Sequence, residues 1–157
     1  MNKPLKMAAW TAAALLILLQ FVPVDRSNPP IKAAMSLPTG EVGEILQDAC
    51  NDCHTHETTW PWYSNVAPVS IFVARHVEEG REHFNFSSWN EQDARRRDHK
   101  LEEMIEMVED GEMPLRSYTI THPEARVTEA QRAALVAWAR GEREKVQAEP
   151  GFSEGEG

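Results

Sequence analysis

The stretch Cys50-Asn51-Asp52-Cys53-His54 holds both cysteines of the 157-residue chain, with an imidazole directly behind the second thiol. Three kinds of site use two cysteines at this spacing: a redox dithiol, a zinc site and covalent attachment of haem. A thioredoxin-type dithiol follows a strand within a βαβ pattern, and no strand pattern precedes Asp48. Zinc needs four ligands, and no second ligand pair stands at finger distance from this one.

Covalent haem attachment explains all three residues together. Cys50 and Cys53 match the spacing of the two haem vinyl groups, and His54 would then be held under the iron as the proximal ligand. The sequence therefore predicts one covalently attached haem c, with Cys50 and Cys53 as thioether sites and His54 as a metal ligand.

A sixth ligand is predicted at Met113, in the stretch Gly111-Glu112-Met113-Pro114. This stretch should lie just past a helix end, where a loop can turn a thioether inward. Methionine opposite histidine raises the reduction potential, and two filled axial positions favour electron transfer. The alternative for Met113 is ordinary core packing. His76 falls on an apolar helix face, where a buried, hydrogen-bonded histidine is the ordinary interpretation.

The body of the chain, residues 39–146, shows helical periodicity and no useful stretch of period two, which predicts an all-α domain. The expected helices follow Thr39 up to Ala49, run from Pro68 to Gly80, run from a capping box at Ser88 and Glu91 to Gly111, and follow a capping box at Thr128 and Gln131. Long loops are expected over residues 54–67 and 111–127.

The N-terminus resembles an export segment. Lys3 and Lys6 precede an uncharged apolar run from Met7 to Val22. No small-x-small cleavage site follows closely, and at about 1.5 Å per residue the run from Leu5 to Val24 just spans a core of about 30 Å. We therefore expect residues 1–24 to be an inner-membrane anchor with the haem domain in the periplasm. The alternative is a cleaved signal and a soluble periplasmic protein.

Two further segments flank the body. Residues 25–38, with three prolines, are expected to form an extended tether, and residues 147–157 a disordered polar tail. The net charge of −9 argues against a nucleic-acid partner, because phosphates would repel the acidic surface.

Aromatic and basic residues are candidates for the haem surroundings. Trp60, Trp62 and Tyr63 could wall the ring and donate hydrogen bonds to its propionates, with ordinary aromatic packing as the alternative. Arg81, and also Arg75, could neutralise propionates or be surface charges.

With these residues in view, the chain resembles the bacterial haem-binding domain family of exported or membrane-anchored, cytochrome c-like monohaem proteins. The resemblance is carried by CNDCH at 50–54, WPWYS at 60–64, PVS at 68–70, VEEGR at 77–81, NFS at 85–87 with Trp89, GEMP at 111–114 and HPEA at 122–125. RSNP at 26–29, after the apolar run, also fits. It implies a cytochrome c-like fold in which the helix at 42–49 crosses the one at 135–138.

The function expected from these features is single-electron transfer by a carrier that is not an enzyme, with a redox partner protein that the sequence does not identify. Two alternatives remain open. A haem sensor would have a labile Met113, and a peroxidase would have an open distal side on which His76 is the one tempting acid–base residue.

Overall fold

The computed structural model describes residues 2–152. Over these residues the chain forms seven α-helices, three short 3-10 helices and no strand, so the predicted all-α class is confirmed. The α-helices are α1 (Lys3–Leu19), α2 (Glu41–Ala49), α3 (Asn51–His54), α4 (Val69–His83), α5 (Ala94–Glu109), α6 (Arg116–Thr121) and α7 (Glu129–Gln147). The 3-10 helices are η1 (Trp62–Asn65), η2 (Phe86–Glu91) and η3 (Pro123–Ala125).

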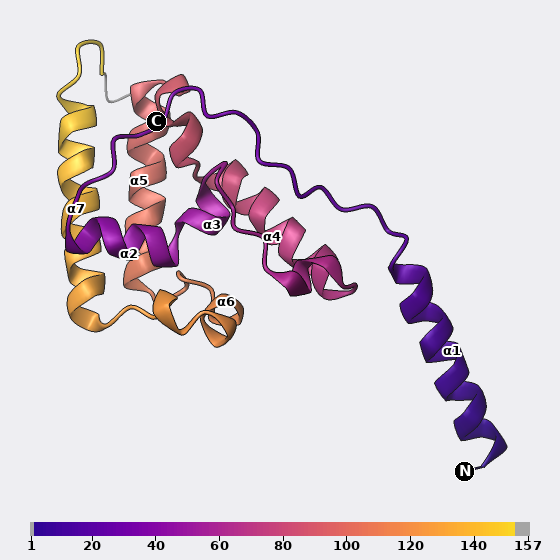
Figure 1. Ribbon diagram of the computed structural model, residues 1–157. Helices are drawn as coiled ribbons and strands as arrows, with labels where there is room; N and C mark the ends of the chain where they lie inside the picture. The colour runs from indigo at the N-terminus through magenta and orange to yellow at the C-terminus, as the bar shows by residue number, and fades with distance from the viewer. Residues whose placement is uncertain (1, 153–157) are drawn as a thin grey trace.

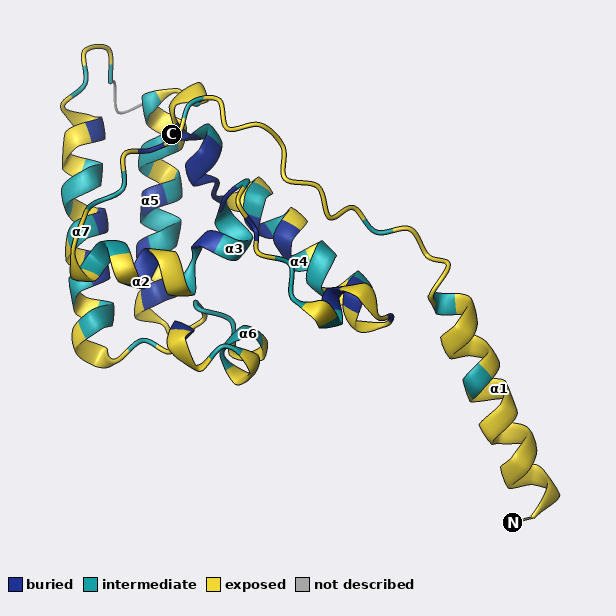
Figure 2. Ribbon diagram, viewed as in Figure 1, coloured by how far each residue is buried: buried dark blue, intermediate teal, exposed yellow. Residues whose placement is uncertain are grey.

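The core lies where α5 and α7 pack side by side and antiparallel, with α2 lying across α7 (Figure 1). Each of the three helices contributes one fully buried leucine, namely Leu46, Leu101 and Leu135. Figure 2 shows the buried residues of these helices gathered on the faces that meet. Burying such side chains stabilises the fold by about 1.5–3 kcal/mol each. The contact between α2 and α7 agrees with the crossing that the family resemblance implies.

Helix starts follow local capping chemistry. Thr128 begins α7 with a capping box, in which its hydroxyl accepts from the Gln131 amide at 3.2 Å and the Gln131 side chain accepts from the Thr128 amide at 2.9 Å. The predicted capping box at 88–91 is wrong. Those residues lie in η2, and α5 begins directly after Asp93, whose carboxylate accepts from the Arg96 amide at 2.9 Å. Aspartate caps a helix as well as serine does, and η2 occupies the backbone around Ser88.

The N-terminal apolar run forms a shorter helix than the sequence suggested. Helix α1 ends at Leu19 after 17 residues, and a turn and extended chain follow. At about 1.5 Å per residue its length is about 26 Å, short of an apolar core of about 30 Å. Among residues 2–152, no helix is both long enough and apolar enough to cross a membrane. The predicted spanning helix is therefore not supported.

The extended segment 25–38 lies along the helical body. The Met35 amide donates to the Phe86 carbonyl at 2.8 Å, and the Asn90 amide donates to the Ala33 carbonyl at 2.9 Å. The Met35 side chain is buried in the core. At the other end, Glu149 pairs with Arg97 at 2.6 Å beyond the end of α7. The tail predicted to be disordered spans residues 147–157, of which 153–157 lie outside the described residues.

Candidate functional site

The Cys50–His54 stretch is a single helical turn. The amides of Cys53 and His54 both donate to the Cys50 carbonyl, at 3.2 and 3.0 Å. Residues three and four apart on a helix share a face, so both thiols and the imidazole point the same way. All three line a cavity of about 520 Å³ that extends to α4, α5 and α6. The structure thus brings together the three residues that the motif predicted for haem.

The ring of His54 is held in one orientation by the backbone of α4. Its Nδ1 lies 3.0 Å from the Gly80 carbonyl oxygen and 2.8 Å from the Phe84 carbonyl oxygen. A carbonyl only accepts hydrogen bonds, so Nδ1 carries the proton and Nε2 has a free lone pair. Burial lowers the pKa of His54, which favours this neutral form. Metal-bound histidines are held in the same way, through the second ring nitrogen.

Gly80 allows α4 to approach the motif closely. A Cβ at this position would lie 2.7 Å from the Cys53 carbonyl oxygen and 3.2 Å from the Cys53 Cβ. The predicted end of the helix at Gly80 is wrong, because α4 continues to His83. The glycine is present for contact with a residue far away in the chain, which a pattern of helix signals does not reveal.

The two thiols have an environment that disfavours the thiolate. They form no disulfide with each other. Burial, and then the neighbouring Cys53, raises the pKa of Cys50 to about 12, and burial with the Asp52 carboxylate raises that of Cys53 to about 11. Reactive dithiols and zinc ligands are thiolates. Within residues 2–152, no group of three or more His, Cys, Asp or Glu side chains is placed to hold a metal ion.

Met113 lies in the wall of the same cavity as His54. Helix α5 ends at Glu109, and Gly111 follows with φ of +74°, a left-handed conformation that suits glycine. The chain then folds back, and the amides of Glu112 and Met113 both donate to the Met107 carbonyl at 3.0 Å. The loop that the sequence predicted to turn a thioether inward is thus present. Met104 and Met107 of α5 also line the cavity.

Tyr118 is a cavity residue that the sequence analysis missed. Its hydroxyl donates to the Asp52 carboxylate at 2.8 Å, which links α6 to the Cys50–His54 turn. Burial and this carboxylate raise the pKa of Tyr118, so it remains a donor. Its ring stacks on His122 with centroids 4.0 Å apart. The region was expected to be a loop, and a tyrosine five residues after Met113 was the available signal.

The aromatic and basic candidates lie away from the main cavity. Neither Trp60 nor Trp62 lines it, and Trp62 is 78% exposed. Tyr63 lines a second cavity of about 330 Å³, which shares Cys53 and Tyr118 with the first. Arg81 does not line either cavity. Its guanidinium donates to four oxygens, those of the Thr55 and Ser27 carbonyls, the Asn28 side chain and the Thr58 hydroxyl.

Two further candidates lie on α4. Arg75 is exposed and pairs with Glu79 at 2.7 Å. His76 lines both cavities, and its Nδ1 lies 2.8 Å from the Phe72 carbonyl oxygen. Since α4 is the helix behind His54, His76 comes from a different wall than Met113 does.

A sequence profile of the haem-binding domain family matches residues 14–141. The chain belongs to the haem-binding domain family. No curated protein and no solved structure matches the chain. The matched range of the haem-binding domain includes both thiols, His54, Met113 and every residue that lines the two cavities. The protein therefore binds haem.

The residues of the main cavity fit a haem group. The cavity volume of about 520 Å³ lies in the range of cofactor sites, about 300–1,000 Å³. Apolar side chains such as Phe84, Val108 and Leu115 form much of its wall. In the described part of the chain, no hydrogen bond occupies the free Nε2 of His54.

Proposed function

We propose that the chain is a c-type monohaem cytochrome that carries single electrons. Cys50 and Cys53 would hold the haem by thioether bonds, and His54 Nε2 and the Met113 sulfur would ligate its iron. The haem supplies one-electron redox chemistry when it is bound. The observation that carries the proposal is that the N–H of His54 Nδ1 donates to the Gly80 and Phe84 carbonyl oxygens, which leaves Nε2 free beside both thiols.

The chain's own residues would keep the site rigid and dry. The α4 backbone fixes the plane of His54, the turn after Gly111 fixes Met113, and apolar side chains limit the entry of water. Two fixed ligands keep the structural rearrangement between oxidation states small, which favours a carrier over a catalyst. The buried, protonated thiols support attachment of haem over dithiol exchange.

The test is the linkage between haem and polypeptide. After co-expression with cytochrome c maturation factors, the pyridine haemochrome spectrum should report two thioether bonds, and mass analysis should find one haem per chain. The variant Cys50→Ala should give a spectrum of single-thioether type. Extraction of the haem from the native protein by acidified organic solvent would refute covalent attachment.

Two further assays distinguish an electron carrier from a haem sensor and from a peroxidase. A stable six-coordinate site should resist carbon monoxide in the reduced state, whereas a sensor with a labile Met113 would bind it. Peroxide turnover that vanished in His76→Ala would instead support an enzyme, although His76 comes from the helix behind His54.

We further propose that the N-terminal segment exports the haem domain and keeps it at the periplasmic face of the inner membrane, near a redox partner protein. The basic start and uncharged apolar run support this. Protease treatment of spheroplasts should cleave the haem domain without lysis, and protection from protease would contradict the proposal.

A further inference from the structure

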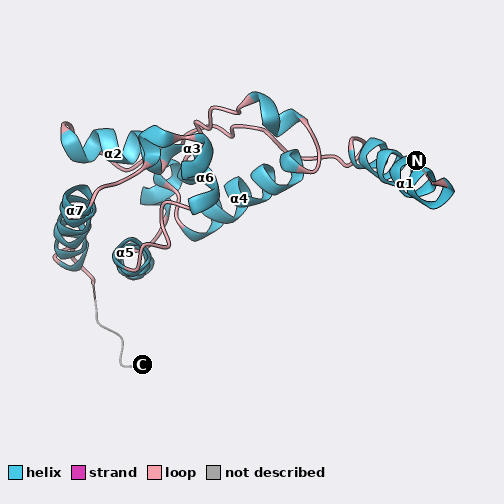
Figure 3. Cartoon of the chain, turned by 90° about the horizontal axis from the view of Figure 1, so that it is seen from below, coloured by secondary structure: helices cyan, strands magenta, loops and turns pink. Residues whose placement is uncertain are grey.

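Two uncharged stretches of this charged chain meet at one end of the molecule. Charged residues make up 26% of the composition, yet none lies between Lys6 and Asp25 or between Glu57 and Arg75. The first stretch contains most of α1, and the second contains η1 and the first turns of α4. Figures 1 and 3 show α1 extending from the body beside the end at which α4 begins.

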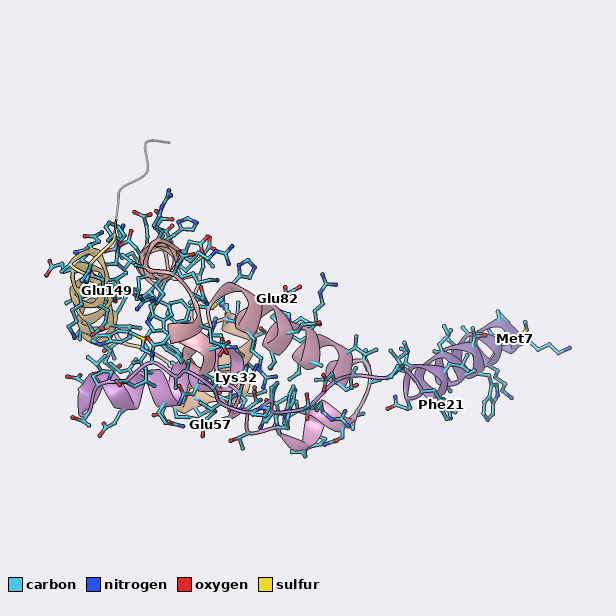
Figure 4. The ribbon with its side chains drawn as sticks, turned by 90° about the horizontal axis from the view of Figure 1, so that it is seen from above. Met7, Phe21, Lys32, Glu57, Glu82 and Glu149 are labelled. Carbon is cyan, nitrogen blue, oxygen red and sulfur yellow. The ribbon has the colours of Figure 1, made fainter. Side chains whose placement is uncertain are left out.

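Specific hydrogen bonds join the two stretches. The Gln20 side chain donates to the Ala67 carbonyl at 3.0 Å and accepts from the Ala67 amide at 3.0 Å. Just past the end of the first stretch, Arg26 donates to the Ser64 carbonyl at 3.0 Å. Figure 4 shows Phe21 near the end of α1 that faces the body and Met7 near the far end. The end of α1 is therefore fixed next to η1 and α4.

Four apolar side chains are exposed at this junction. They are Trp62 (78% exposed), Val66 (48%), Val69 (43%) and Phe72 (50%), which we call the tip patch. Val69 and Phe72 share one face of α4, since they are three residues apart. Single exposed apolar residues are common, but several in one uncharged stretch indicate an interaction surface.

We propose that the tip patch rests on a lipid surface, with α1 in the lipid beside it. The apolar exposure continues from the patch into α1, where Leu16, Ile17, Leu18 and Phe21 are exposed as well. Tryptophan and tyrosine prefer the boundary between lipid and water, and the tip patch contains Trp62 with Tyr63 beside it, their ring centroids 5.9 Å apart. Charged side chains are costly in lipid, which accounts for their absence from both stretches.

The lack of charge also favours lipid over a protein partner. Protein docking surfaces are surrounded by a polar rim, and electrostatic complementarity selects the partner. The tip patch has few polar or charged groups that could select a protein partner in this way. The net charge of −9 would also oppose attraction to anionic headgroups. Apolar insertion would therefore supply the affinity, and binding would change little with salt.

The inference rests on the proposed membrane association of α1 and is independent of the haem. Photocrosslinking in the full-length holoprotein tests it. The photoreactive residue p-benzoylphenylalanine replaces Trp62 in one variant, Leu18 in α1 in a second, and the exposed Ala137 of α7 in a third, at the far end of the molecule (Figure 1). Each variant is illuminated in phosphatidylcholine liposomes and in native membranes, and the adducts are identified by mass spectrometry.

We expect lipid adducts at positions 18 and 62, in several-fold excess over position 137. Lipid adducts at 18 without any at 62 would overturn the tip-patch inference alone. Absence of lipid adducts at both positions would overturn the membrane association as well, and leave the haem assignment intact. A protein adduct at 62 in native membranes, in place of lipid, would identify a protein partner and overturn the inference. If the Trp62 variant fails to take up haem, the probe at the exposed Val66 provides the same measurement.

Discussion

Replacing Gly80 with alanine tests whether the close approach of α4 orients His54, the proposed haem ligand. In an ordinary helix interior this change stabilises the fold by about 1 kcal/mol, because glycine is a poor helix former. Here the new Cβ would lie 2.7 Å from the Cys53 carbonyl oxygen, a backbone atom that has little freedom to move. Helix α4 would have to shift away from the motif.

The cost can be estimated from the contacts that the shift disturbs. Overpacking costs about 1–3 kcal/mol, and the single N–H of His54 Nδ1, shared between the Gly80 and Phe84 carbonyl oxygens, contributes about 1 kcal/mol. After subtracting the gain in helix propensity, Gly80→Ala should lower the free energy of unfolding by about 1–3 kcal/mol. The amount of haem bound per chain should also fall, because the imidazole loses its orientation.

The matched control is Gly141→Ala in α7. Position 141 is a helix interior where a Cβ would meet nothing within 4 Å. This variant should be more stable than the wild type by up to about 1 kcal/mol. Urea unfolding followed by circular dichroism measures both variants. If Gly80→Ala proves as stable as the wild type, or gains stability as Gly141→Ala does, the argument for close approach is refuted.

Three further changes test other parts of the structure. Met113→Ala should abolish the weak red-end absorption band of sulfur ligation and lower the reduction potential, whereas Met104→Ala should keep both; retention of the band in the first variant would exclude Met113 as a ligand. Arg81→Ala should lower the free energy of unfolding by about 1–3 kcal/mol, because four hydrogen bonds are lost. It should also make residues 25–30 sensitive to protease. Unchanged proteolysis would show that Arg81 does not hold this segment. The Arg143 guanidinium holds the pKa of Asp98 below its usual value. The contribution of this ion pair to the free energy of unfolding is therefore fully present above about pH 4, and it is lost as the pH falls through the lower pKa of Asp98 in the folded state. Asp98→Asn should therefore reduce the loss in the free energy of unfolding between about pH 5 and about pH 2, measured by unfolding at each pH. A loss as steep as in the wild type would contradict this assignment.

Local signals in the sequence predicted the parts of the fold that local chemistry decides. The capping box at Thr128 and the turn at Gly111 depend on neighbours within a few residues, and both are present. The positions that were missed depend on contacts between distant residues. Gly80 meets Cys53, and Tyr118 meets Asp52. Neither pair leaves a periodic pattern, since each contact arises only when α4 or α6 packs on the motif.

The support of His54 by main-chain carbonyls has a consequence for evolution and for redesign. Carbonyl groups are present whatever the side chain is, so no substitution deletes these acceptors outright. A carboxylate acceptor would make the imidazole more electron-rich, and mutation could add or remove it. Here the acceptors are main-chain carbonyls, so this adjustment is not available. Differences in reduction potential between relatives would then have to arise at the proposed ligand Met113 or in the polarity of the cavity. A designer who transplants the pentapeptide to a new scaffold must also transplant the backbone path of α4.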